Sequence, residues 1–158
     1  MMPFSRIATY AAALSLATLV GCASPNSDRS GSSRSAPSSV QMQAILAATP
    51  EDVDFLIVPS ASNALSNKLI QAALASGSGS TAVDTLYRQL TSGIKTVTGI
   101  VGDSPVLNRS TLKATLNKLK GQQTQGRVFI EADATEGAEL VTLGEAVGVQ
   151  VVIVQPAK

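Results

Sequence analysis

The residues with the most scope for chemistry lie in three short polar segments, each of which directly follows an apolar run. The first segment begins after Val58, the second after Val101 and the third after Ile130. If all three meet at one edge of a sheet, their carboxylates could hold Mg²⁺, with a phosphate bound at a helix N-terminus nearby. The candidate ligand residues are Ser60, Ser62, Asn63, Asp103, Ser104, Glu131, Asp133 and Thr135.

Each of these residues also has a simpler explanation in local backbone structure. Asp133 opens an Asp-x-x-Glu pattern typical of a helix N-terminus, and Asp103 lies in a Gly-Asp-Ser-Pro turn. Ser60 or Ser62 can cap a helix that follows the first apolar run. Arg109 is the nearest basic residue that could neutralise a phosphate, and the chain has no glycine-rich nucleotide fingerprint. Both interpretations therefore stay open, a ligand site and a set of caps and turns.

A second feature is an uneven distribution of charge along the C-terminal half. Arg109, Lys113 and Lys120 fall on one stripe of a helix expected over about 110–120. The following unit is acidic, with Glu131, Asp133, Glu136, Glu139 and Glu145. The basic stripe could dock a partner, or copies of the chain could stack head to tail as a homo-oligomer. Alternatively, these are solvated helix faces that partly pair with each other.

Composition excludes several classes of function. The chain has no histidine and one cysteine, Cys22, so the folded part offers no His-based catalysis, Cys nucleophile, Cys/His zinc site or disulfide. A net charge of +1 and 3% aromatic residues argue against nucleic-acid binding. No G-x-S-x-G elbow is present. We therefore expect no catalytic residue, no metal and no cofactor.

These residues must be positioned by a repeating strand–helix pattern. Apolar runs over 54–58, 95–101, 127–131 and 149–154 predict strands, and amphipathic segments between them predict helices. The first helix should bury one stripe, and the second should start at the Thr81-x-x-Asp84 capping box. The stripe consists of Leu65, Leu69, Ile70, Ala73 and Leu74. The prediction is an α/β fold, a small three-layer sandwich of flavodoxin-like or Rossmann-like type with a mainly parallel sheet of about four strands. Residues 40–48 fit either a short helix or an edge strand.

The N-terminal segment has the pattern of a targeting signal. An apolar run from Ile7 to Val20 follows Arg6 and ends in Leu19-Val20-Gly21-Cys22. This run is too short for a membrane span and fits a signal peptide. The motif resembles the lipobox of bacterial lipoproteins, and the resemblance covers residues 1–22 only. It implies cleavage after Gly21 and acylation of Cys22, whereas an ordinary secretory signal is the alternative.

This interpretation predicts three regions: a signal peptide over 1–21, the acylated cysteine with a tether over 22–39, and a single α/β domain over 40–158. Residues 23–39 contain eight serines and two prolines but no large apolar side chain. Such a segment cannot bury enough surface to fold. As a flexible chain it would span roughly 20–25 Å.

The combination of anchor, tether and a domain poor in reactive groups predicts a non-catalytic binding or assembly module. It would be an accessory subunit of a cell-envelope complex such as a secretion, pilus, conjugation or cell-wall machine. The alternative is a small nucleotide- or phosphate-binding domain with a Mg-dependent activity at the strand edge. Ala23 replaces the Asp that favours inner-membrane retention in the enterobacterial lipoproteins it resembles. We therefore expect the protein to be anchored at the periplasmic face of the outer membrane. In a cell without an outer membrane, we expect it at the outer face of the plasma membrane.

Overall fold

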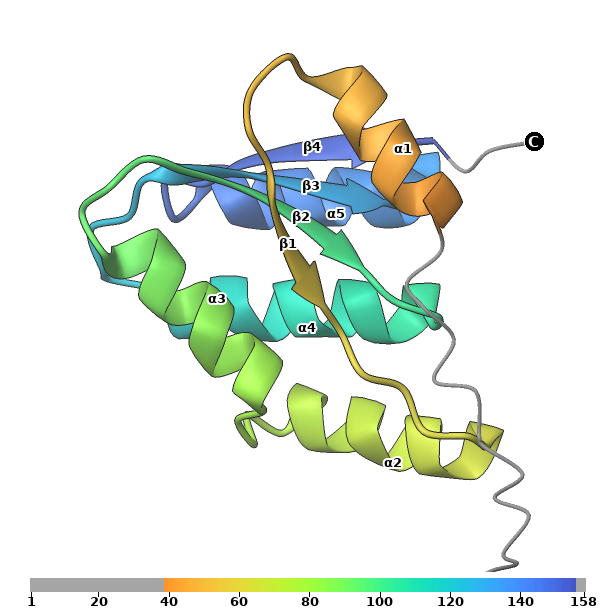
Figure 1. Cartoon of the computed structure of the whole chain (residues 1–158). Coiled ribbons are helices and arrows are strands. Elements are labelled where there is room, and N and C mark those ends of the chain that lie inside the picture. The colour runs from red at the N-terminus through yellow and green to blue at the C-terminus, as the bar shows by residue number, and fades with distance from the viewer. Residues whose placement is uncertain (1–38, 156–158) are drawn as a thin grey trace, which may run out of the picture. The chain divides into compact units, whose positions relative to one another are not determined.

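The four apolar runs form one sheet in which every neighbouring pair is parallel (Figure 1). The structure is a computed structural model that describes residues 39–155. The strands are β1 (Asp54–Ile57), β2 (Thr96–Val101), β3 (Gly126–Glu131) and β4 (Gln150–Val154). Their order in the sheet is β1-β2-β3-β4, the same as in the chain. Each strand therefore pairs with the strand that precedes or follows it in sequence.

The helices are α1 (Ser39–Ala48), α2 (Ala64–Ala75), α3 (Thr81–Thr91), α4 (Pro105–Lys118) and α5 (Ala134–Glu145). Crossovers between parallel strands share one hand, so a sheet built in chain order collects its crossover helices on one face. Helices α2 to α5 lie on that face, and α1 covers part of the other (Figure 1). The predicted α/β three-layer sandwich with a parallel sheet is confirmed.

The main core lies between the sheet and helices α3, α4 and α5. Alternate strand residues such as Ile100, Val128 and Val151 point toward it, as expected for the two-residue period of a strand. From the helices, Leu86, Leu112 and Leu116 are fully buried, and Leu140 of α5 joins the same cluster. This core positions the N-termini of α4 and α5 at the carboxyl ends of β2 and β3.

A smaller core lies on the opposite face of the sheet. Ile45 of α1 is buried against Val101 and Phe129, and Met42 packs beside them. Residues 39–48 are thus a helix packed on this face of the sheet, and the edge-strand alternative is wrong. The side chain of Gln41 adds a polar tie, because its Oε1 accepts a hydrogen bond from the backbone N–H of Gly102 at 3.2 Å.

Three helix starts differ from the sequence prediction. Asn63, and neither Ser60 nor Ser62, caps α2. Ser80 caps α3, so Thr81 is its first helical residue. Helix α4 begins at Pro105, five positions before the predicted start at Ser110, because Ser104 caps it and proline suits the first helical position. Consequently the predicted Gly-Asp-Ser-Pro turn is a helix start.

The helix that carries the predicted basic stripe also ends earlier than expected. It stops at Lys118, so Lys120 lies beyond its last turn, next to Gly121 with φ of +80°. No helix of the described residues is long and apolar enough to cross a membrane. The predicted signal peptide, Cys22 and the tether up to residue 38 lie outside residues 39–155.

Candidate functional site

The carboxyl ends of the strands carry the predicted ligand residues, and three of these cap helices. Asn63 Oδ1 accepts the backbone N–H of Ser66 at 2.7 Å, and Ser104 Oγ accepts that of Leu107 at 3.4 Å. Asp133 Oδ1 accepts the N–H groups of Thr135 and Glu136 at 3.0 and 2.9 Å. These side-chain oxygens are thus used by their own helices.

The electrostatics of Asp133 follow from this geometry. The backbone N–H of Glu136 contributes most to lowering the pKa of Asp133, and the N–H of Thr135 and the charge of Arg109 lower it further. A carboxylate held in this way at a helix N-terminus is ionised at neutral pH. This charge stabilises the start of α5, which is the role that the capping interpretation predicts.

The remaining candidates of this edge are not helix caps. Ser62, Asp103 and Thr135 are exposed, while Ser60 and Glu131 are half-buried. Within residues 39–155, no three His, Cys, Asp or Glu side chains are grouped so that they could hold one metal ion. The alternative in which Asp103, Glu131 and Asp133 gather around Mg²⁺ therefore finds no such group of carboxylates among the described residues.

Two residues of the predicted basic stripe face α5 and pair with it. Arg109 Nε lies 2.9 Å from Glu136 Oε2, and Lys113 forms an ion pair with Glu139. Lys120 is exposed beyond the helix end. Two basic and two acidic residues therefore pair across the α4–α5 contact, in line with the interpretation of solvated helix faces that partly pair with each other.

Lys118 is a charged residue that the sequence reasoning missed. Its Nζ lies 2.7 Å from Asp84 Oδ1 and 4.8 Å from the centre of the Tyr87 ring, so it joins α4 to α3. A basic residue in the last turn of one helix and an acidic residue in the first turn of another were the available signal. Their pairing depends on α3 and α4 lying side by side, which the sequence pattern alone does not show.

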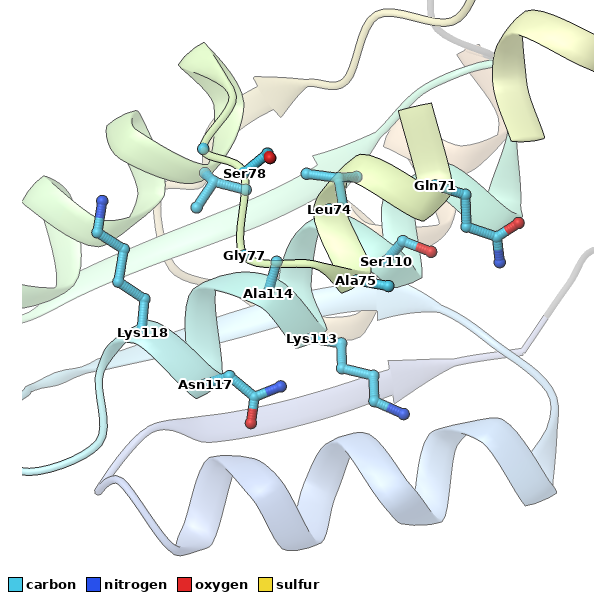
Figure 2. Close-up of a pocket in the computed structure, with 12 residues that line it drawn as sticks. Gln71, Leu74, Ala75, Gly77, Ser78, Ser110, Lys113, Ala114, Asn117 and Lys118 are labelled. Carbon is cyan, nitrogen blue, oxygen red and sulfur yellow. The ribbon is translucent and has the colours of Figure 1, made fainter. Parts of the chain in front are cut away.

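Two hollows adjoin α2, and neither was predicted. The first, about 590 Å³, lies between the end of α2, the start of α3 and α4 (Figure 2). Leu74 and Ala114 lie on it, and Lys113 and Lys118 stand at its rim with their ammonium groups paired as described. The second, about 760 Å³, lies between β1, α2 and α3. Both volumes fall in the range of ligand sites in proteins.

Helix α2 itself departs from the prediction of one buried stripe. Ile70 and Leu74 face the rest of the molecule, but Leu65 and Leu69 are 70% and 64% exposed. At about 100° per residue, the five apolar side chains of the predicted stripe spread over roughly half of the helix circumference. One contact with the rest of the molecule cannot cover such a wide surface. The two leucines therefore form an apolar outer face of α2.

The chain matches no known protein family, no curated protein and no solved structure.

Proposed function

We propose that this chain is a lipid-anchored, non-catalytic protein-binding module of the bacterial cell envelope. It acts as an accessory subunit of a secretion, pilus, conjugation or cell-wall complex. The observation that supports this best is the apolar outer face of α2, defined by Leu65 and Leu69. Exposed apolar side chains that adjoin one another on one surface are typical of protein contact sites.

The composition of α2 also suits a protein contact. Lys68 is the one charged residue among its twelve, and Ala72 and Ala73 next to the two leucines are exposed as well. Full burial of a leucine side chain is worth about 1.5–3 kcal/mol. A partner that covers both leucines would therefore gain a substantial part of a specific binding free energy. By contrast, the charged faces of α4 and α5 are largely satisfied within the molecule.

The predicted anchor gives this surface a location. Acylation of Cys22 and a flexible tether would hold the domain near the membrane while it rotates to meet a partner. We expect the domain to be held at the periplasmic face of the outer membrane. Replacing Cys22 by serine should leave uncut precursor or a soluble domain, and intact mass of the wild type should show the added acyl chains. A wild-type protein without lipid would contradict the anchor.

The docking surface can be tested in intact cells by site-specific photocross-linking. A photoreactive residue at Leu69 should yield a discrete cross-linked product, and the same residue at the exposed Ala138 of α5 provides the matched control. Leu65→Glu should abolish the Leu69 product while the domain stays folded by circular dichroism. Equal labelling from both positions, or no product from Leu69, would contradict the proposal.

A further inference from the structure

The hollow of about 760 Å³ is a groove with one wall formed by the end of β1 and the segment that follows it. Leu56 to Ala61 make this wall, and the other wall consists of Ile70 and Leu74 of α2 with the first turns of α3. None of the residues that line the groove in the described chain is charged. A surface of this kind favours uncharged, apolar groups.

β1 is an end strand of the sheet, with β2 on one side. The N–H of Val58 donates to Val101 O at 2.8 Å, and Ile57 is in register with Val101. Because backbone groups alternate along a strand, those of Leu56 and Val58 face β2, and those of Phe55 and Ile57 face the opposite edge. Among residues 39–155 no strand pairs with that edge, and Ile57 is 56% exposed, so an added strand could pair there.

We propose that this groove, together with the free edge of β1, binds an extended, uncharged peptide segment of a partner protein. The segment pairs with the backbone groups of Phe55 and Ile57 and directs alternate apolar side chains into the groove. This is the β-strand addition seen in several peptide-recognition domains. Asp54 and Pro59 bound the pairing segment, which restricts it to a short stretch.

Two other occupants fit the observations less well. An acyl chain would fill the apolar groove but has no donors or acceptors for the edge of β1. A second copy of this chain would offer its own β1 edge, whose inward side chains Leu56 and Val58 already belong to its own core. The peptide satisfies both the groove and the strand edge. The inference rests on the proposed protein-binding function and adds the chemistry of the bound segment.

The test uses the full-length lipoprotein reconstituted in lipid nanodiscs. Twelve-residue random peptides are selected on it by display, and enriched sequences are synthesised and titrated by calorimetry. Enriched peptides should carry apolar residues at alternate positions and no charge between them. On binding, the amides of Phe55 and Ile57 should become protected from hydrogen exchange.

Two variants with matched controls locate the site. Ile57→Pro removes an outward N–H without removing a β1–β2 hydrogen bond, and should weaken binding about tenfold or more, whereas Ile57→Ala keeps the N–H and most of the affinity. Thr85→Glu places a charge in the groove at a half-buried position and should also weaken binding, whereas Thr85→Val should retain it. Because these variants act at different elements, a folding defect in one leaves the other informative.

Four results would overturn the inference. The first is a peptide that binds the Ile57→Pro variant as tightly as the wild type, and the second is the absence of any enriched peptide. The third is palmitate that displaces the bound peptide and whose own binding is unchanged in Ile57→Pro. The fourth is protection of the β1 amides that accompanies self-association of the protein, measured by sedimentation. If such a result occurs while Leu69 still cross-links to a partner, the proposed function stands and only the groove is reassigned. If the Leu69 cross-link is absent as well, both proposals fail.

Discussion

The carboxylate of Asp133 accepts hydrogen bonds from two backbone N–H groups at the start of α5. Its charge therefore contributes to the free energy of unfolding. Folding lowers the pKa of Asp133 below the value of about 3.9 for an unfolded aspartate. The ionised carboxylate therefore stabilises the folded state at neutral pH, and this contribution is lost as the pH falls through the folded-state pKa.

Replacing Asp133 by asparagine keeps a side-chain oxygen for the cap but removes the charge. We expect the variant to unfold at lower urea concentration than the wild type at neutral pH. The difference should begin to shrink below about pH 3.9, where the carboxyl group of the unfolded chain becomes protonated, and should be lost below the folded-state pKa. Asp103→Asn is the matched control, because Asp103 is exposed and Ser104 supplies the cap of α4. A gap between wild type and Asp133→Asn that is independent of pH would contradict the assignment of this charge.

The alternative function at the strand edge is tested with the same variant. If the edge residues are caps and turns, Mg²⁺ with a nucleotide should leave the melting temperature unchanged. A bound ligand at a hundred times its dissociation constant would instead stabilise the protein by about 2.7 kcal/mol. Inorganic phosphate provides a second probe. A shift that disappears in Asp133→Asn would favour the nucleotide- or phosphate-binding function over the one proposed.

Among elements, the contact between α5 and β4 depends on the small size of Gly144. A Cβ at this position would lie 2.6 Å from the carbonyl oxygen of Val149 and 2.6 Å from a methyl group of Val151. The backbone of Val149 cannot retreat easily, because its N–H donates to Gly144 O at 2.9 Å. Helix α5 and β4 would therefore have to separate to admit a side chain.

Gly144→Ala should destabilise the protein by about 1–3 kcal/mol, although alanine is the better helix former. Gly79→Ala is the matched control, because its Cβ would meet only the carboxylate of Asp84 at ordinary contact distance, 3.6 Å. Chemical denaturation of both variants checks this. If Gly144→Ala proved as stable as Gly79→Ala, α5 would have shifted without loss of packing, which would contradict this prediction.

The sequence predicted the elements better than their ends or their arrangement. Asp133 was identified as a cap, but Ser104 was assigned to a turn because serine and aspartate make the same local hydrogen bonds in turns and caps. The five apolar residues of α2 indicated a helix correctly. Which of them would be buried depends on the packing of α2 against α4, and the groove beside β1 depends on the same contact. Neither is encoded in local periodicity.

Across the whole molecule, stability should be unevenly distributed. Leu74 is the one buried residue within α2, whereas α4 buries six, among them Leu107, Leu112 and Leu116. The connection after α2 passes through Gly77, with φ of +82°, and Gly79. Regions with few buried apolar contacts open at lower free energy than the core.

Hydrogen exchange of the full-length protein should therefore show the amides of α2 exchanging before those of β2, β3 and α4. A bound partner that covers Leu65 and Leu69 should slow the exchange of α2 more than that of the core elements. Exchange of α2 together with α4 in a single cooperative step would contradict this. In that case the two hollows beside α2 would be fixed features of a rigid domain.

The order of the strands has a consequence for how the chain acquires its structure during synthesis. Because each strand pairs with the one made just before it, the sheet can grow by addition at a single advancing edge. β1 does not have to wait for a distant C-terminal segment, as an N-terminal strand in the middle of a reordered sheet would. Nearby pairing partners also favour fast folding. Within residues 39–155, the first strand to emerge remains at the margin of the finished sheet, and no later strand covers its outer edge.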